Sequence, residues 1–231
     1  MHARQQTSET TGALSDIDLV RLVAAGDQRA FELLMRRHNR MLFRAARAIL
    51  KDDSEAEDAL QEAYLSAYRA LAGFRGEAQV STWLARIAIN EALGRRRRRK
   101  AEAAVIPLED ATDPDGELPA GDGTDQQRTL PEFSAMRTEA RALMERKIDA
   151  LPEQFRVVFV LRAIEELSVE ETASCLGIPE ATVRTRFFRA RSLLRESLAR
   201  EMDSALDEVF AFAGSRCDRI VGAVLARLRS P

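Results

Sequence analysis

The sequence predicts an all-α protein: two small helical domains joined by a flexible acidic linker, followed by a C-terminal helical extension. Apolar residues recur at helical spacing on both sides of residues 101–136, and Ser-x-x-Glu capping motifs precede two of these segments. Residues 101–136 hold four of the seven prolines and no sustained period. The expected boundaries are a disordered tail at 1–13, domains at 14–100 and 137–200, the linker at 101–136, and the extension at 201–231.

Four helices are expected in the first domain. Ser15 should cap a short helix through Ala24, and Gly26 and Asp27 end that helix and cap the next one. The second helix shows apolar residues at helical spacing, namely Phe31, Leu34, Met35, Leu42, Ala45, Ala46 and Ile49.

The third helix should begin at a capping box formed by Ser54 and Glu57 and run to about residue 71. Two glycines, at 73 and 76, then indicate a loop. Ser81 or Thr82 should cap a fourth helix, which carries five consecutive arginines.

The second domain is also read as helical. A helix is expected over Ala142–Ala150, and Pro152 suits the first turn of the next, which "FRVVFVLRAI" continues. A β-strand is the alternative for "RVVFVL". Ser168 and Glu171 form a capping box, and a helix should run from about Pro179 towards residue 202.

Charge is distributed unevenly along the chain. The total is close to neutral, with 35 Lys and Arg against 37 Asp and Glu. Leu84–Lys100 nevertheless holds seven basic residues and one acidic one, whereas Ala101–Phe133 holds nine acidic residues and one basic one. Pro179–Arg200 holds six arginines and two glutamates. Two basic segments therefore flank an acidic spacer, and the near-neutral total charge hides this arrangement.

Other classes of protein are disfavoured. No run of 18 apolar residues and no signal peptide is present, so we expect no membrane insertion and a cytoplasmic location. Two cysteines and two histidines are too few for a disulfide framework or a zinc finger. No nucleophile elbow, P-loop or metal-ligand cluster occurs, so we expect no catalytic residue, no metal and no cofactor.

The segment "SVEETASCLGIPEATVRTRFFRARSLL" carries the most specific pattern. Ala173, Gly177 and Val183 have the spacing of a helix-turn-helix: a small residue at the helix crossing, a glycine in the turn and an apolar residue in the second helix. That helix should present four side chains to a DNA major groove, and the alternative is a solvated face of ordinary ion pairs. The four are Arg184, Thr185, Phe188 and Arg189, while Phe187 is expected in the core.

The third helix has two different faces. Its expected inner stripe consists of Ala59, Leu60, Ala63, Tyr64, Ala67 and Leu71. The opposite face, which combines acids, an amide and a leucine, is typical of a docking surface, although an isolated exposed leucine is also common. Its members are Asp58, Gln61, Glu62 and Leu65.

Aromatic residues precede the arginine run. Phe74 and Trp83 flank a glycine-containing loop at the start of the basic helix. Aromatic rings that receive unpaired bases, next to arginines that hold the backbone, are what single-stranded DNA requires. The alternative for Trp83 is an ordinary place in the core.

With these elements in order, the chain resembles the extracytoplasmic-function (ECF) group of bacterial RNA polymerase sigma factors, in the sigma-70 family, over about residues 14–200. The segments that carry the resemblance are "DSEAEDALQEAYLSAYRAL", "FRGEAQVSTWLARIAINEAL" and "LPEQFRVVFVLRAIEELSVEETASCLGIPEATVRTRFFRARSLL". The resemblance implies a non-enzymatic initiation factor that binds core RNA polymerase, directs it to promoters with −35 and −10 elements, and helps to melt the −10 region.

The resemblance also implies residue roles. The docking face (Asp58, Gln61, Glu62, Leu65) would bind the clamp of the largest polymerase subunit, and helices around residues 151–167 would meet the flap. The helix-turn-helix quartet (Arg184, Thr185, Phe188, Arg189) would read the −35 element. The −10 DNA would be held by Phe74, Trp83, Arg86, Asn90, Arg95, Arg96 and Arg97.

Two features depart from the family pattern. Gly94 stands where many relatives carry an acid, and it should loosen the helix there by about 1 kcal/mol and fray the arginine run. The extension carries one apolar stripe, formed by Ile220, Val221, Val224, Leu225 and Leu228. It either folds back on the second domain or docks a regulator such as an anti-sigma factor. The alternative to the whole assignment is a freestanding helix-turn-helix regulator, which would need no single-strand site.

Overall fold

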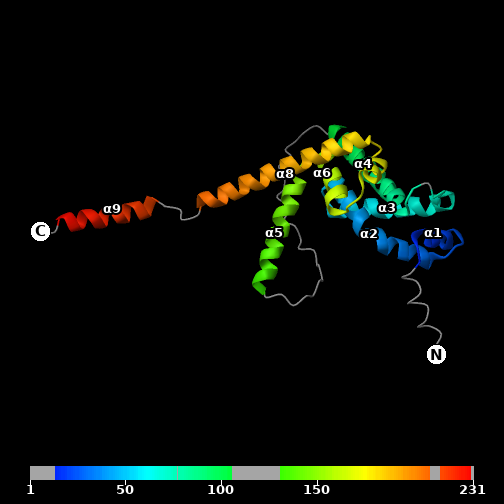
Figure 1. Ribbon diagram of the computed structural model, residues 1–231, viewed down its shortest axis with the longest axis horizontal. Coiled ribbons are helices and arrows are strands. Elements are labelled where there is room, and N and C mark those ends of the chain that lie inside the picture. The colour runs from blue at the N-terminus through cyan, green and yellow to red at the C-terminus, as the bar shows by residue number, and fades with distance from the viewer. Residues whose placement is uncertain (1–13, 77, 106–130, 209–213, 230–231) are drawn as a thin grey trace, which may run out of the picture. The chain divides into compact units, whose positions relative to one another are not determined.

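The computed structural model describes residues 14–76, 78–105, 131–208 and 214–229 (Figure 1). These residues contain helices and no strand, which confirms the predicted fold class. The chain divides into two compact units, Met1–Arg191 and Ser192–Pro231. The predicted tail at 1–13 and most of the predicted linker lie outside the described residues. The α-helices are α1 (Asp16–Ala24), α2 (Gln28–Leu50), α3 (Asp53–Ala70), α4 (Val80–Val105), α5 (Pro131–Asp149), α6 (Glu153–Phe159), α7 (Val169–Leu176), α8 (Glu180–Glu208) and α9 (Gly214–Arg229).

Short-range capping explains where the first helices begin. Ser15 accepts a hydrogen bond from the backbone amide of Asp18, and Asp27 accepts from the amides of Arg29 and Ala30, as predicted. The predicted capping box at Ser54 is wrong. Asp52 instead accepts a hydrogen bond from the backbone amide of Glu55 and is the N-cap of α3. The helix therefore begins at Asp53, before the position expected from a cap at Ser54.

Helix α4 differs from the prediction at both ends. It begins at Val80, so neither Ser81 nor Thr82 caps it, and the side chain of Thr82 is buried. It also continues through Gly94 to Val105, so the predicted fraying at the glycine is wrong. The penalty of a single glycine is small beside the packing of α4, whose Leu84, Ala88 and Ala92 are buried.

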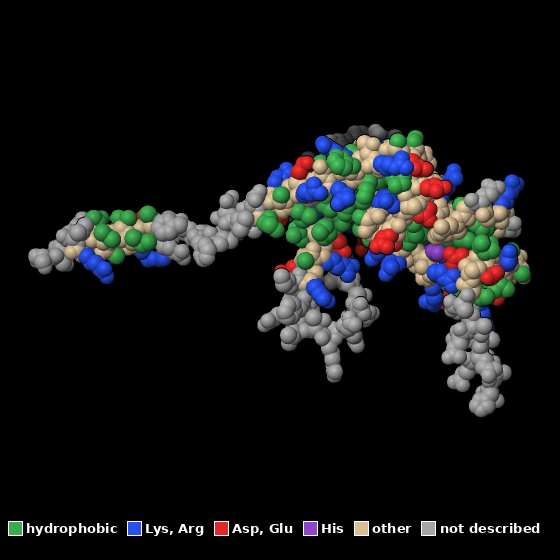
Figure 2. Space-filling view, viewed as in Figure 1, with side chains coloured by type: hydrophobic (Ala, Val, Ile, Leu, Met, Phe, Trp, Pro, Cys, Tyr) green, Lys and Arg blue, Asp and Glu red, His purple; other side chains and the backbone are tan. Residues whose placement is uncertain are grey.

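Helices α1 to α4 form a first helical block and α5 to α8 a second one, and in the described part of the second block every regular element is a helix. "RVVFVL" belongs to α6 and to a π-helical turn over Val160–Ile164, so the strand alternative is wrong. Helix α5 begins inside the segment predicted as linker, and α8 extends beyond residue 202. Within α9, the side chains of Ile220, Val221, Val224 and Leu225 are exposed, and Figure 2 shows apolar side chains gathered along this helix. The side chain of Leu228 lies outside the described ones.

One apolar core runs through both blocks. Helices α2, α3 and α4 pack against one another, and α1 packs against α2. Alanines at the crossings let the helix backbones approach closely, and Ala45, Ala59, Ala63, Ala85 and Ala88 are all buried. Helix α6 packs against α2, and α7 packs against α4. As a result, Val157 and Leu161 of the second block share a core cluster with Leu34 and Ile49 of the first.

Among the residues that the structure describes, no helix is both long enough and apolar enough to cross a membrane.

Candidate nucleic-acid interface

The helix-turn-helix has the predicted geometry. Ser168 and Glu171 exchange both hydrogen bonds of a capping box at the start of α7, at 3.0 Å and 2.7 Å. Gly177 ends α7 with a φ of 63°, in the left-handed region that favours glycine. Val183 of α8 is fully buried. The turn thus fixes the direction in which α8 leaves α7.

Helix α8 presents the predicted quartet to solvent. Arg184, Thr185, Phe188 and Arg189 are all exposed, and Phe188 has an exposed fraction of 75%. Arg184 donates to Glu180 at 2.5 Å, one turn earlier. The Thr185 hydroxyl donates to the Ala181 carbonyl at 2.9 Å, so the oxygen lone pairs and the methyl group remain for a ligand.

Phe187 lies on a different side of α8. Its ring stacks on Phe159 with centroids 6.4 Å apart, and the guanidinium carbons of Arg162 and Arg191 lie 5.5 Å and 5.8 Å from its centre. Phe187 is half-buried, in keeping with the prediction that it packs inside the protein. The contacts with Phe159 and Arg162 hold α8 against α6 and the π-helical turn that follows α6.

The aromatic pair lies where the loop enters α4. The Phe74 and Trp83 rings have centroids 5.3 Å apart and are tilted by 59°, and both residues are half-buried. Trp83 therefore packs partly against the core and is partly accessible to solvent. Arg86 and Asn90 follow along α4 and are exposed.

The arginine run is not uniform. Arg97 is exposed, whereas Arg95 and Arg96 are half-buried. Arg95 lies near three acids: Glu55 (3.7 Å), Asp58 (3.5 Å) and Glu91 (3.7 Å). Arg96 forms an ion pair with Glu153 of α6. Of the four arginines predicted to hold −10 DNA, two, Arg95 and Arg96, are thus already paired with carboxylates.

The two faces of α3 are separated as predicted. All six residues of the inner stripe are buried. The docking face is exposed, and Leu65 has an exposed fraction of 50%. A half-exposed leucine ringed by acids and an amide is an anchor that a partner protein can cover. The ion pair with Arg95 ties Asp58 of this face to α4.

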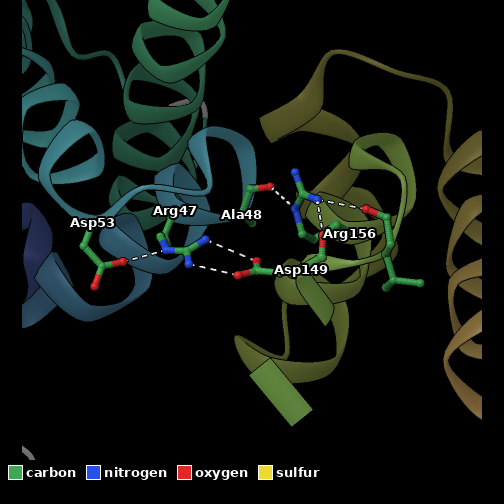
Figure 3. A network of polar contacts seen from close by, with 6 residues as sticks. Arg47, Ala48, Asp53, Asp149 and Arg156 are labelled. Carbon is green, nitrogen blue, oxygen red and sulfur yellow. Dashed lines mark hydrogen bonds and ion pairs between the residues drawn. The ribbon is translucent and has the colours of Figure 1, made fainter. Parts of the chain in front are cut away.

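The structure adds an inter-block polar network that sequence reasoning missed (Figure 3). Asp149, at the end of α5, joins two arginines: its carboxylate accepts from Arg47 at 3.2 Å and 2.9 Å, and its backbone carbonyl accepts from Arg156 at 3.0 Å. Arg47 also donates to Asp53 at 2.6 Å. Burial would lower the pKa of Arg47, but its hydrogen bonds with Asp149 and Asp53 outweigh burial and raise the pKa.

Arg156 is the buried arginine of this network and donates hydrogen bonds to three backbone carbonyls. It is only 2% exposed, and it donates to the carbonyls of Ala48 at 2.5 Å and Leu151 at 2.8 Å as well as to that of Asp149. These carbonyls lie at the C-terminal ends of α2 and α5, where backbone oxygens lack helical partners and the helix dipoles are negative. Burial lowers the pKa of Arg156, with Asp149 opposing that shift.

Two further contacts join the blocks. Arg44 of α2 donates to Glu165 at 2.8 Å, and the Glu165 side chain is only 7% exposed. The thiol of Cys175 in α7 donates to the carbonyl of Thr82 in α4 at 3.6 Å. Burial raises the pKa of the Cys175 thiol to about 12. The paired residues are far apart in the chain and form no motif, so no sequence signal identified them.

Across the described ranges, no group of three or more His, Cys, Asp or Glu side chains is placed to hold a metal ion.

Comparisons with known proteins agree with this geometry. A family model described as "Sigma-70 region 2" matches residues 34–102, and one described as "Sigma-70, region 4" matches residues 141–194. The chain is 39% identical over 183 residues to the RNA polymerase sigma-H factor of Pseudomonas aeruginosa, covering 79% of this chain and 93% of that protein. It is 36% identical over 182 residues to the ECF RNA polymerase sigma-E factor of Escherichia coli K12, covering 78% and 93%.

Two solved structures share the fold of this chain. CnrH, in complex with the cytosolic domain of CnrY, is similar with a TM-score of 0.52 and 27% identity, over 78% of this chain and 95% of that one. The sigma factor RpoE of Bartonella quintana, in complex with the anti-sigma factor NepR, has the same fold with a TM-score of 0.55 and 22% identity, over 73% and 96%. This chain belongs to the sigma-70 family of bacterial RNA polymerase sigma factors, in its extracytoplasmic-function group.

Proposed function

We propose that this sigma factor assigns promoter recognition to two helices, α4 for the −10 element and α8 for the −35 element, and polymerase docking to α3. As a member of its family, the chain is a transcription initiation factor that binds core RNA polymerase and directs it to promoters. It does so in the cytoplasm, where the polymerase works.

The observation that carries the −35 proposal is the exposed quartet on α8, which follows a turn with helix-turn-helix geometry. Arg184 and Arg189 can each donate two parallel hydrogen bonds to a guanine edge or a phosphate. Phe188 offers a bare ring, which suits a thymine methyl group. The Thr185 hydroxyl, which already donates to a backbone carbonyl, acts as an acceptor.

At the −10 element, we assign base capture to Trp83, with Phe74 as its support. A half-buried ring at the start of a basic helix provides one free π-face for an unpaired base. Arg86, Asn90 and Arg97 are exposed along the same helix and contact the backbone or bases. Arg95 and Arg96 contribute positive charge while remaining tied to carboxylates.

On α3, Asp58, Gln61, Glu62 and Leu65 form the surface for the polymerase clamp, and the segment from Leu151 to Leu167 meets the flap. Support comes from the separation of an exposed mixed face from a buried apolar stripe. An anti-sigma factor is a further partner, because both similar solved structures are complexes and RpoE is bound there to the anti-sigma factor NepR.

The test is reconstituted transcription with purified core polymerase on a random promoter library, with start sites determined by sequencing. We expect starts at a shared pair of −35 and −10 sequences that appear only when this chain is added. If the chain never co-elutes with core enzyme and binds a palindromic duplex tightly by itself, the proposal is overturned in favour of a freestanding regulator.

A further inference from the structure

We propose that α9 is a peripheral membrane-binding helix, which places the C-terminal extension on an anionic lipid surface. The helix lies in the plane of the lipid headgroups, with its apolar side chains towards the acyl chains and its arginines near the phosphates. This role is separate from the promoter and polymerase contacts proposed above, because α9 lies outside both segments that match the sigma-70 family models, 34–102 and 141–194.

One side of α9 carries an exposed apolar stripe. Its described aliphatic residues recur at i, i+1, i+4 and i+5, a spacing that gathers side chains on one face of a helix. These residues are Ile220, Val221, Val224 and Leu225, with exposed fractions between 45% and 51%. In Figure 2 the apolar side chains of this helix follow its upper edge and the basic ones its lower edge. Helix α9 is therefore amphipathic, and its apolar face is accessible.

The charge of α9 is positive and uncompensated. Residues 214–229 hold four arginines against one aspartate, a net charge of +3, although the whole chain carries −2. In other helices, Arg36 and Arg141 each pair with a glutamate one turn away. The residue one turn from both Arg219 and Arg227 is Ala223, so neither arginine has an acid at that position. The charge of α9 thus has the sign that attracts anionic headgroups.

The stripe and the charge together favour a lipid surface over other occupants. No helix in the described part of the chain is both long enough and apolar enough to span a bilayer, so the contact is with one surface of the membrane. A coiled coil with a second copy needs about three to four heptads, whereas α9 has 16 residues. DNA phosphates would accept the arginines but would leave the aliphatic stripe in water. An anionic membrane surface takes up both faces.

The positions of the two described arginines suit this orientation. Arg227 follows Ile220 by seven residues, so it lies at the edge of the stripe. There its methylene groups can rest in the apolar layer while the guanidinium reaches the headgroups. Arg219 lies on the side opposite the stripe. Because salt screens such charges over about 8 Å at physiological ionic strength, added salt should weaken vesicle binding.

The first measurement uses the full chain labelled at Cys217 with a polarity-sensitive fluorescent maleimide. Cys217 is exposed and lies one turn before Val221, on the face of the stripe. Cys175 is buried, and burial raises the pKa of its thiol to about 12, so Cys217 reacts selectively. Vesicles with equal parts of phosphatidylglycerol and phosphatidylcholine should shift the emission to the blue, and spin-labelled acyl chains should quench it. Vesicles of phosphatidylcholine alone should do neither.

Two neighbouring substitutions separate the stripe from the rest of the helix. Val224→Gln places an amide in the stripe, whereas Ala223→Gln places the same amide on the polar side, and both positions are exposed. Flotation of unlabelled protein with the anionic vesicles should show roughly tenfold weaker binding for Val224→Gln, as expected when the burial of one valine is lost. Ala223→Gln should bind as the parent does. Urea unfolding checks that both variants remain folded.

A second pair of variants tests the charge. Arg219→Gln with Arg227→Gln should bind the anionic vesicles at least about tenfold more weakly, because each basic residue near the surface contributes to the attraction. Most of the salt dependence should disappear with it. Arg219→Lys with Arg227→Lys keeps both charges and should retain binding, since attraction to a charged surface does not require the planar guanidinium.

Equal binding to anionic and neutral vesicles, or equal binding by the Val224→Gln and Ala223→Gln variants, overturns the membrane-binding role. A dimer in sedimentation without vesicles, dissociated by Val224→Gln, would assign the stripe to a second copy of the chain. A blue-shifted label in buffer that vesicles leave unchanged would mean that the stripe packs on the chain itself. All these variants should support transcription with core polymerase, so failure of the parent in that experiment concerns the proposed function and not α9.

Discussion

Arg95 of the arginine run lies 3.5 Å from Asp58 on α3, so one ion pair joins the proposed −10 helix to the proposed polymerase-docking face. Glu55 lies 3.7 Å from the same guanidinium nitrogen. Arg95 is thereby held towards α3 and orients an acid that is proposed to bind polymerase. Arg97, two residues on, is exposed. The two arginines should therefore behave differently.

Arg97→Ala should reduce the salt dependence of promoter binding by about one unit in the slope of log K against log salt, as expected when one phosphate contact is lost. Arg95→Ala should leave that slope nearly unchanged and weaken core-polymerase binding by less than about 1 kcal/mol, the usual range for partly exposed ion pairs. Salt titrations of promoter binding and of polymerase binding check both. Equal slope changes for the two variants would contradict the separation of roles.

Leu65 should be an anchor of polymerase docking. Leu65→Asp places a charge at the centre of the docking face and should cost more than about 1 kcal/mol of binding free energy, as for interface anchors in general. Leu65→Met keeps an apolar side chain of similar volume and should bind nearly as the parent does. Binding of fluorescently labelled chain to core enzyme measures both. Comparable loss in the two variants would indicate that unfolding, rather than docking, is responsible.

Trp83 should act when the duplex opens. Trp83→Ala should spare the closed promoter complex but impair melting, because the free π-face for an unpaired base is lost. Permanganate reactivity of thymines in the −10 region measures melting directly. Trp83→Phe retains a ring and should keep most of the reactivity. Normal reactivity in the alanine variant would assign Trp83 to the core alone.

Arg189 should read a base in the −35 element. Arg189→Ala should cost about 1–3 kcal/mol of discrimination at one base pair if the guanidinium makes a bidentate contact. Arg189→Lys keeps the charge and loses the planar fork, so it separates base reading from phosphate binding. Start-site sequencing on promoters varied in the −35 element gives the result. Full activity and unchanged base preference in the lysine variant would mean a phosphate contact.

Two glycines should respond to alanine in opposite directions. Gly177→Ala forces a side chain into a left-handed turn with a φ of 63° and should destabilise the protein by roughly 1–2 kcal/mol. Gly94 lies within α4, and a Cβ there would meet the Arg98 guanidinium at an ordinary 3.7 Å, so Gly94→Ala should stabilise by about 0.5–1 kcal/mol. Urea unfolding of both variants measures the difference, and shifts of the same sign would contradict it.

Local patterns account for what the sequence predicted correctly. The helix-turn-helix was recognisable because Ala173, Gly177 and Val183 lie within a few turns of one another, where spacing determines geometry. The two faces of α3 followed from helical periodicity for the same reason. The cap of α3 was misassigned to Ser54 because Asp52 competes for the same role at nearly the same place.

Long-range contacts account for what the sequence did not predict. Arg156 resembles any arginine on a helix, and its burial depends on carbonyls contributed by the ends of two other helices. Arg44 and Glu165 are separated by 121 positions, so no period connects them. The pairing of Arg95 and Arg96 with acids likewise depends on how α4 lies against α3 and α6. An arginine run therefore indicates charge but does not reveal which guanidinium groups remain available for DNA.

One footprinting comparison tests whether this chain acts as an initiation factor together with polymerase at a promoter of two elements. Promoter DNA from the selected library is probed with permanganate in the presence of this chain alone, core polymerase alone, and both together. We expect reactive thymines at the −10 element only when both are present, and we expect this reactivity to be lost when the −35 sequence is scrambled. Protection of the duplex by the chain alone, with no melting on addition of core enzyme, would contradict it.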